Sequence, residues 1–383
     1  MRDGLQTWLL VVGILLFVPR NINAMTIAPI RPDFEVDGIN YKIIDTIAQT
    51  VRVVQSVDKY QGAVFVSETV TYSGITYSVT EIGKSAFDDC TGLTSVTIPN
   101  SVTEIGSYAF RNTGWYNNQL DGVLYLDNCC LGYKGDEPTG SLSINSGPRL
   151  IADAAFKSCS GLDGIFIPNS VARIGGEAFW YSGLETVHFE DGEIPVSLGY
   201  GISGNKRPIT IITKSVSTTG TVVYCGIFEG NPLKSVYIGR DIVSDEMEAK
   251  PFGYFNDLNS VVFGKKVTTI ENGAFEGSSA ISSVTSLNII PPVCLSVSTF
   301  DDAVYKNATL YVPKASIGRY ATADIWNKFE SVAVSGVESV KNDSYNSIEI
   351  VRYDIHGRLL STPAQGINIV IYSDGTTRKE FVK

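Results

Sequence analysis

The dipeptide Ala-Phe recurs along most of this 383-residue chain at nearly fixed intervals. Successive phenylalanines are separated by 23, 46, 23, 49, 24, 23 and 25 residues, and both 46 and 49 are close to twice 23. Such a period is typical of a solenoid, and it predicts about ten stacked coils, two of them without this anchor. The anchors are Phe87, Phe110, Phe156, Phe179 and Phe275, with looser versions at Phe228, Phe252 and Phe300.

Each repeat also contains a short strand pattern that ends at a proline. In the first complete copy, Val96 and Ile98 are two residues apart, so they share one face of a strand. Pro99 ends that strand because it has no N–H to donate to a ladder. One coil cannot bury its apolar face alone, whereas stacked coils share a continuous core. The pattern therefore predicts a mainly β protein with one uninterrupted solenoid over residues 79–335.

The residue between the two inward positions of each strand must point away from the core. Alignment of the repeats gives an outward row that is aromatic in the middle, beside a second row of small, mostly hydroxylic residues. This arrangement is typical of a binding surface, although cross-strand stacking that only stabilises the sheet is the alternative. We expect an irregular coil to interrupt the outward row between His188 and Tyr237. The ligand-binding candidates are Phe166, His188, Tyr237 and Val262, aligned with Thr97, Ser143 and Thr285 and flanked by Ser95, Gly164, Thr186, Ser235, Ser260 and Ser283.

The pattern I-G-x-x-A-F-x-x-C-x-x-L-x-S-V-x-I-P-x-S-V, which runs from Ile82 to Val102, resembles the BspA-like leucine-rich repeat of bacterial surface proteins. The resemblance covers residues 79–332 and implies a curved solenoid with a parallel sheet along one side. Members of that family are mostly regarded as adhesion or host-interaction proteins. The resemblance therefore implies a binding role outside the cell, towards a protein or a glycan.

Segments on both sides of the repeats are expected to close the solenoid. Residues 25–78 hold alternating strand-like runs with glycine-containing turns, which predict an N-terminal β cap. A closing unit begins at Asn307, with a short helix expected at Ala315–Phe329. Residues 336–383 start as a polar linker and continue into a small β module. Its Tyr-Asp-x-x-Gly-Arg motif, beginning at Tyr353, resembles the C-terminal sorting module of type IX secretion substrates, with a plain β cap as the alternative.

Residues 1–24 have the features of a secretory signal peptide. Arg2 precedes the short apolar run Leu9–Val18, and Ala24 offers a small residue before a cleavage site. The run is too short for an ordinary membrane-spanning helix, although an uncleaved anchor is the alternative. We expect export to the cell surface (outer membrane) or to the medium. The net charge of −10, without any basic run, argues against nucleic acid or anionic lipid as a partner.

No motif in the sequence points to catalysis, a metal or a cofactor. The two histidines, His188 and His356, are far apart, which argues against a His-based triad or a His-rich zinc site. The run Gly199–Gly204 matches G-x-G-x-x-G, but Pro208 and a strand-like stretch follow where a helix would have to open. This run therefore predicts a loop, and we expect a protein without enzymatic activity or cofactor.

Six cysteines in an exported chain raise the question of disulfides. Cys90 and Cys159 occupy the same repeat position three coils apart. At about 4.8 Å per coil they lie roughly 14 Å from each other, beyond the reach of about 7 Å that a disulfide allows. We expect both to be small corner residues of the coils. The pairing of Cys129, Cys130, Cys225 and Cys294 stays open, as does the oligomeric state.

Three classes of function fit these features. An adhesion or binding module explains the signal, the repeat and the missing catalytic motifs, and it is the preferred interpretation. A structural surface-layer component is the second class. A polysaccharide-active β-helix enzyme is disfavoured, because the outward row offers Thr, Ser, Phe, His and Tyr rather than clustered acidic and basic residues.

Overall fold

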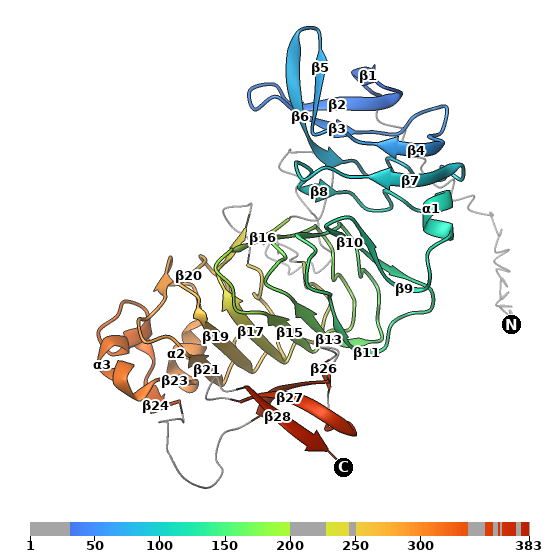
Figure 1. Cartoon of the computed structure of the whole chain (residues 1–383). Coiled ribbons are helices and arrows are strands. Elements are labelled where there is room, and N and C mark those ends of the chain that lie inside the picture. Colours follow the sequence, from blue (N-terminus) through green and yellow to red (C-terminus); the bar gives the residue numbers. More distant parts are fainter. Residues whose placement is uncertain are drawn as a thin grey trace, which may run out of the picture. The chain divides into compact units, whose positions relative to one another are not determined.

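Stacked parallel strands form the centre of the chain in the computed structural model (Figure 1). The structure describes residues 31–199, 227–244, 250–335, 349–354, 359–360, 362–372 and 377–382. The predicted fold class is confirmed, since the chain is a mainly β solenoid of about 10 turns. The signal peptide expected at residues 1–24 lies outside the described residues, and the domain boundaries expected after residues 24, 78 and 335 stay predictions.

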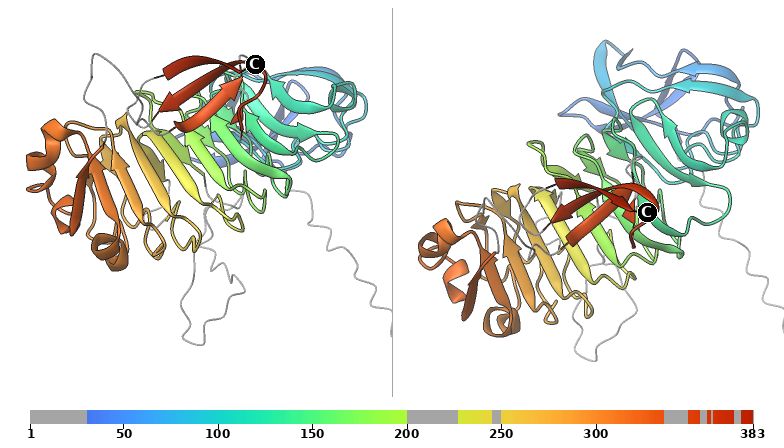
Figure 2. Two further views of the ribbon diagram at one scale, coloured as in Figure 1. Left: turned by 90° about the horizontal axis from the view of Figure 1, so that it is seen from below. Right: turned by 60° about the horizontal axis from the view of Figure 1, so that its bottom comes forward.

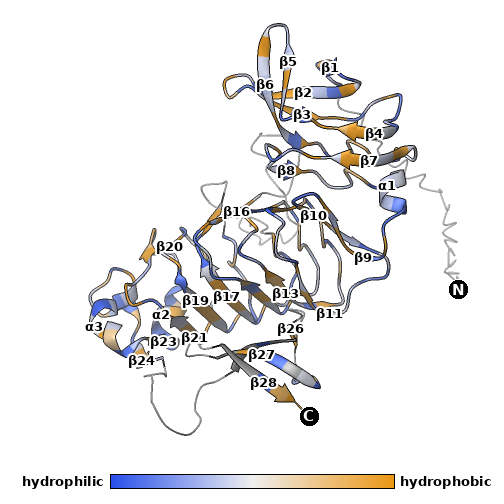
Figure 3. Cartoon of the chain, in the orientation of Figure 1, coloured by the Kyte–Doolittle hydropathy of each residue, from blue (hydrophilic) through white to orange (hydrophobic). Residues whose placement is uncertain are grey.

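The largest sheet is an eight-stranded parallel sheet, to which successive coils contribute one strand each (Figures 1 and 2). Inward and outward positions alternate as expected, because Ile165 and Ile167 are fully buried while Phe166 between them is half-buried. Figure 3 shows that hydrophobic residues, coloured orange, recur along these strands. In order across the sheet, the strands are β11 (Gly140–Ser143), β13 (Leu162–Ile167), β15 (Thr186–Phe189), β17 (Ser235–Arg240), β19 (Ser260–Lys266), β21 (Ser283–Ser286), β23 (Thr309–Val312) and β24 (Ser331–Val334).

Many of the same coils contribute a short strand to a second, six-stranded sheet. Its strands are parallel except for the antiparallel hairpin at one edge. In order, they are β18 (Ile242–Ser244), β16 (Val196–Leu198), β14 (Arg173–Ile174), β12 (Leu150–Ile151), β10 (Cys129–Lys134) and β9 (Gly122–Leu126). Later coils contribute a separate parallel pair, β20 (Thr269–Ile270) and β22 (Val293–Cys294).

The Ala-Phe dipeptide forms the centre of an anchor turn, and consecutive anchor turns stack on one another. The N–H of Phe87 donates to the carbonyl of Ala109 at 2.8 Å, and the Phe156 N–H donates to Ala178 at 2.7 Å. The rings stack at 5.5 Å between the centroids of Phe156 and Phe179. The phenylalanines that the repeat spacing identified thus lie one above another in consecutive coils. The stacked rings form two runs, Phe87–Phe110 and Phe156–Phe179–Phe228–Phe252–Phe275–Phe300.

A backbone feature that the sequence pattern did not reveal flanks the anchors. The residues two before and two after the phenylalanine have positive φ in several coils, for example 55° at Ser85 and 59° at Asp89 around Phe87. L residues adopt this left-handed conformation at a cost of about 1–2 kcal/mol, which glycine avoids. Gly230 and Gly277 occupy the second of these positions in later coils, with φ of 76° and 77°.

In the described residues of the 49-residue interval, no additional coil separates the two anchors. Phe179 and Phe228 stack directly at 5.5 Å, and β15 pairs with β17. The prediction of a coil without an anchor is therefore wrong here, because neither the sheet nor the ring stack leaves a position for one. Residues 200–226 of this interval lie outside the described residues.

The interval of 46 residues does contain a coil without an anchor, and the stack is interrupted there. β10 and β11 provide strands of this coil, but the described residues show no ring contact between Phe110 and Phe156. The short helix α1 (Gly114–Asn117) and the β9–β10 hairpin follow Phe110 instead. Buried hydrophobic residues accordingly form two clusters, one from Phe34 to Ala152 and one from Cys130 to Phe329. Arg31–Lys383 nevertheless form one compact unit.

Further β elements precede and follow the stacked coils, as expected. The N-terminal sheet has the order β1-β2-β3-β6-β5, with β8 paired to β6, while β4 and β7 form a separate parallel pair. The single helix expected at Ala315–Phe329 is instead broken into three short turns. The bounds are β1 (Phe34–Val36), β2 (Ile39–Asp45), β3 (Thr50–Val53), β4 (Gly62–Phe65), β5 (Thr69–Tyr72), β6 (Ile75–Ile82), β7 (Leu93–Thr97), β8 (Glu104–Ile105), α2 (Asp302–Asn307), η1 (Lys314–Ser316), α3 (Ile317–Tyr320) and η2 (Trp326–Lys328).

The C-terminal residues form a four-stranded antiparallel sheet with the order β26-β25-β27-β28. These strands lie within the small β module expected in residues 336–383. The bounds are β25 (Glu349–Asp354), β26 (Leu359–Leu360), β27 (Gly366–Tyr372) and β28 (Thr377–Val382).

Candidate binding surface on the eight-stranded sheet

The outward row predicted from the repeats exists as a continuous register across the eight-stranded sheet. Phe166 pairs with His188, His188 with Tyr237, and Tyr237 with Val262. The irregular coil expected between His188 and Tyr237 does not interrupt this sheet, because β15 pairs directly with β17. The complete row is Ser143, Phe166, His188, Tyr237, Val262, Thr285, Tyr311 and Ala333.

The ends of the row differ from the sequence alignment. Thr97 lies in the separate pair of β4 and β7, where it is in register with the exposed Phe65. Tyr311 joins the row at the opposite end, and it was missed because the closing unit was not aligned with the repeats. Its Leu-Tyr-Val sequence, from Leu310 to Val312, has the same alternation as the earlier strands and is the signal that identifies it.

The second row, two residues earlier in each strand, is almost entirely small and hydroxylic. We call it the hydroxyl row. Hydrogen bonds already use some of its side chains: Ser141 Oγ donates to Asp163 Oδ1 at 2.6 Å, and the hydroxyls of Thr309 and Ser331 are 3.3 Å apart. The hydroxyl row comprises Ser141, Gly164, Thr186, Ser235, Ser260, Ser283, Thr309 and Ser331.

The three central rings of the outward row stack on one another. The ring centroids of Phe166 and His188 are 5.0 Å apart, and those of His188 and Tyr237 are 4.3 Å apart with planes inclined by only 5°. Both faces of the imidazole are thereby covered, and His188 is 7% exposed. Burial lowers the pKa of His188 to about 3, so the imidazole is neutral at physiological pH.

Exposure varies along the row. Phe166 and Tyr237 are half-buried, as a partly accessible surface requires. His188 and Val262, at 7% and 9% exposure, are largely covered. At these two positions the outward side chain is therefore covered, although its neighbours in the hydroxyl row are small. The rings of Phe166 and Tyr237 cover the two faces of His188, a contribution that alternation alone does not describe.

Tyr237 is fixed at its outer end by a carboxylate that sequence reasoning missed. Its hydroxyl donates to Asp191 Oδ1 at 2.8 Å, and burial together with this carboxylate raises the pKa of Tyr237. Burial also raises the pKa of Asp191. The space around the pair is small, since a Cβ at Gly264 would lie 2.3 Å from Asp191 Oδ1. Asp191 was not identified because it follows the strand β15 rather than lying in it.

The side chains of the outward row are suited to non-covalent contact. In the described residues, no group of three or more His, Cys, Asp or Glu side chains is placed to hold a metal ion. The G-x-G-x-x-G run lies outside the described residues after Gly199. Phe166, His188 and Tyr237 offer aromatic area and a neutral imidazole beside a row of hydroxyls, which suits apolar contact and hydrogen bonding.

The described cysteines are free thiols. Cys90 and Cys159 are thus unbonded, as predicted, although Cys159 is only half-buried. Burial raises the pKa of Cys129 and Cys130 to about 12, so both are thiols rather than reactive thiolates at neutral pH. Cys225 lies outside the described residues.

Stacked coils with a parallel sheet and a repeated leucine, isoleucine and phenylalanine core define a leucine-rich repeat solenoid. The model of the BspA type leucine rich repeat region matches this chain in six copies, over residues 59–185, 136–198 and 210–308. The matched residues make up more than half of the chain, and the protein belongs to this family. Membership suggests a protein-binding role at the cell surface.

Several solved leucine-rich repeat structures are similar to this chain. A leucine rich cell surface protein from Faecalibacterium prausnitzii shares 15% identity, with 80% of this chain and 95% of that chain covered and a TM-score of 0.21. A leucine-rich repeat protein from Bacteroides ovatus shares 18% identity, covering 79% and 99%, with a TM-score of 0.22. A leucine rich repeat protein from T. pallidum shares 15% identity, covering 68% and 85%, with a TM-score of 0.25. The family assignment rests on the repeat model.

A comparison with curated proteins gives no match. Within the part of the chain that the structure describes, every helix is too short or too polar to cross a membrane.

Proposed function

We propose that the protein is an exported, cell-surface or secreted adhesion protein that binds another protein through the outward row of its eight-stranded sheet. The observation that carries this proposal is the unbroken register of Phe166, His188 and Tyr237 beside the hydroxyl row. Family membership supports a protein ligand over a glycan, and proteins of this family are typically not enzymes. The candidate contact residues remain Phe166, His188, Tyr237 and Val262, with Tyr311 added.

The fixed orientations and the neutral side chains of the central outward row favour recognition of a ligand by shape and apolar contact. Phe166 and Tyr237 hold fixed orientations because each stacks on His188, and Tyr237 also donates to Asp191. Side chains that are already ordered lose little conformational entropy when a ligand binds. Since the imidazole is neutral, we expect the contact to depend only weakly on ionic strength.

The same stacking also favours a second candidate function, a structural component of a surface layer. Ring pairs across neighbouring strands contribute about 0.5–1.5 kcal/mol each beyond their area burial, which is sufficient reason to keep them without a ligand. The two functions differ in what a substitution does: a structural row affects stability alone, whereas a binding row also affects affinity.

The test is an array of host proteins and glycans probed with the full chain, followed by affinity measurements on the proteins it retains. The double variant Phe166→Ser/Tyr237→Ser should weaken binding by at least ~10-fold, as expected when central aromatic residues of an interface are lost. It should also lower the free energy of unfolding by about 1–3 kcal/mol, because two ring stacks disappear.

The matched control is Phe65→Ser/Tyr72→Ser, which removes one exposed phenylalanine and one exposed tyrosine outside the eight-stranded sheet. The control should bind like the unchanged chain. Equal binding by the row variant and the unchanged chain, with only stability reduced, would assign the row to sheet packing. Retention of glycans alone would replace the protein ligand with a sugar.

The proposed route to the surface uses the C-terminal sheet as a type IX secretion sorting module, with attachment at the outer membrane. Support comes from the motif that begins at Tyr353 and from the separate antiparallel sheet β25–β28. Within it, Arg352 donates to Asn368 at 3.1 Å and to Glu380 at 2.8 Å, which ties three strands together. Deletion of residues 336–383 in a host with this secretion system should leave the protein in the periplasm, and surface display of the shortened chain would contradict the assignment.

A further inference from the structure

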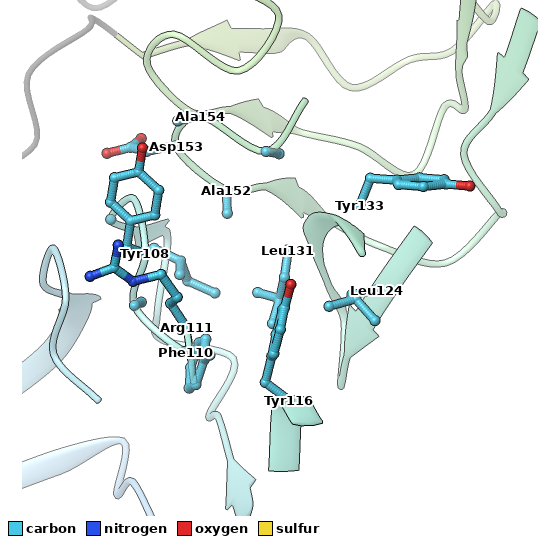
Figure 4. Close-up of a pocket in the computed structure, with 14 residues that line it drawn as sticks. Tyr108, Phe110, Arg111, Tyr116, Leu124, Leu131, Tyr133, Ala152, Asp153 and Ala154 are labelled. Carbon is cyan, nitrogen blue, oxygen red and sulfur yellow. The ribbon is translucent and has the colours of Figure 1, made fainter. Parts of the chain in front are cut away.

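A cavity of about 190 Å³ lies where the stack of anchor turns is interrupted (Figure 4). Tyr108 and Arg111 come from the anchor turn of Phe110, and Ala152 and Ala154 come from the coil of Phe156. Tyr116 of α1, together with Leu124, Leu131 and Tyr133 of the β9–β10 hairpin, completes the wall. We call this cavity the anchor gap.

The anchor gap occupies the place of a missing anchor turn. Where the stack is regular, one anchor turn bonds directly to the next, as from Phe87 N–H to the Ala109 carbonyl and from Phe156 N–H to Ala178. The described residues show no such bond from Phe110 to the coil of Phe156. The intervening coil supplies β10, which pairs with β12, but its chain then continues along the hairpin instead of forming an anchor turn.

One wall of the gap keeps the backbone conformation that binds a neighbouring turn. Tyr108 and Asn112 have φ of 61° and 55°, matching the corresponding residues around Phe87. In that regular turn, the N–H groups at these positions and at the phenylalanine donate to three carbonyls of the next coil. In the described part of the chain, the N–H groups of Tyr108, Phe110 and Asn112 have no such acceptor. Tyr108 and Phe110 line the gap, so their N–H groups are two donors at its wall, spaced two residues apart.

The remaining surface of the gap accommodates one ring and little more. Ile105, Leu124, Leu131 and the alanines offer apolar contact. Phe110, which stacks on Phe87 and meets Trp115 edge-on, also lines the gap. The carboxylate of Asp153 is already engaged, since its Oδ1 accepts from Gly176 N–H at 2.9 Å. A volume of about 190 Å³ is well below the range of about 300–1,000 Å³ typical of small-molecule pockets, so it suits a single side chain.

We infer that the anchor gap binds a short peptide segment of a partner protein, with an aromatic side chain inserted beside Phe110. The segment takes the place of the missing anchor turn, and its carbonyls accept from the N–H groups of Tyr108 and Phe110. Peptide carbonyls match donors at a spacing of two residues, whereas a sugar ring has no such repeat. The anchor gap contains no residue of the outward row, so peptide binding there can be tested independently of the proposed function.

The probe is a synthetic heptapeptide with the chain's own anchor sequence, Gly-Glu-Ala-Phe-Trp-Tyr-Ser, taken from residues 176–182. A control peptide carries alanine in place of the phenylalanine. Calorimetric titration of the full chain should show saturable binding of the first peptide and at least ~10-fold weaker binding of the control peptide, because the ring supplies most of the apolar contact.

Variants of the protein locate the binding site. Ala155→Leu fills the gap and should weaken peptide binding by at least ~10-fold. Ala48→Leu makes the same chemical change at an exposed turn and should leave binding unchanged. Leu131→Trp, which fills the gap from the opposite wall, provides the same test if Ala155→Leu does not fold.

Three results would overturn the inference. The first is no saturable binding of the phenylalanine peptide, or equal binding of both peptides. The second is binding that survives both gap-filling variants. The third is a saturable response to monosaccharides, or self-association of the chain, that Ala155→Leu removes while the peptide does not bind; either would assign the gap to a different occupant.

Discussion

Truncation of an anchor phenylalanine tests the physical basis of the whole stack. Phe179 is fully buried, and its ring stacks on Phe156 and on Phe228, both at 5.5 Å. Phe179→Ala removes a buried aromatic ring, for which about 3–5 kcal/mol is the usual loss, and it breaks two ring stacks at once. We expect a loss near 5 kcal/mol, at the upper end of that range. Phe110 stacks on only one anchor ring, Phe87, so Phe110→Ala should lie nearer ~3 kcal/mol.

The assay is chemical unfolding of the full chain, followed by both circular dichroism and tryptophan fluorescence. Two probes are needed because a solenoid can unfold in segments, and a single transition then has no unique free energy. Phe156→Ala should also lower the free energy of unfolding. Lys265→Ala, at an exposed position, should change it by no more than about 0.5 kcal/mol. If Phe179→Ala costs no more than Lys265→Ala, the anchor assignment is wrong. Equal losses for Phe110→Ala and Phe179→Ala would mean that the interruption of the stack has no energetic consequence.

Individual residues give three further predictions. The pKa of His188 is about 3 in the folded chain, below the value of about 6.5 in the unfolded chain. The contribution of His188 to the free energy of unfolding is therefore fully present above pH 6.5 and is lost as the pH falls, at up to about 1.4 kcal/mol per pH unit. His188→Phe should flatten the dependence of the melting temperature between pH 7 and pH 5. Peptide mapping without reductant should recover Cys90 and Cys159 unlinked; a peptide joining them would contradict the coil register. Gly277→Ala, at φ 77°, should destabilise the chain by about 1–2 kcal/mol in urea unfolding, whereas Gly318→Ala, in a short helix with open space around it, should be neutral or stabilising.

The regular part of the fold could be predicted from the sequence because each position recurs many times. The Ala-Phe spacing identified the anchor turns, and the alternation of Ile165, Phe166 and Ile167 identified which side chains face outward. Stacking of identical units turns a sequence alignment into a spatial register, so the alignment alone could place Phe166, His188 and Tyr237 in one row. Whether a ligand uses that row is a separate question that register does not answer.

Properties that depend on neighbours in space were harder to predict. Alternation placed His188 outward, but its exposure is decided by Phe166 and Tyr237, which cover its two faces. Asp191 reaches Tyr237 from a segment after the strand, where no repeat position marks it. The left-handed residues around the anchors were missed because Ser85 and Asp89 are not glycines, and only later coils place glycine there.

The two long intervals show why spacing alone is an incomplete description of a solenoid. Intervals of 46 and 49 residues are both close to twice the period, yet among the described residues only the first contains a coil of its own. The segment before Phe156 supplies strands to both sheets, Cys129–Lys134 and Gly140–Ser143, whereas the described part of the segment before Phe228 supplies one coil's pair, Thr186–Phe189 and Val196–Leu198. A strand pattern, rather than a residue count, therefore decides whether a coil is present. Where a coil is present without its anchor, the stack must leave an unfilled position, and in this chain that position is the anchor gap.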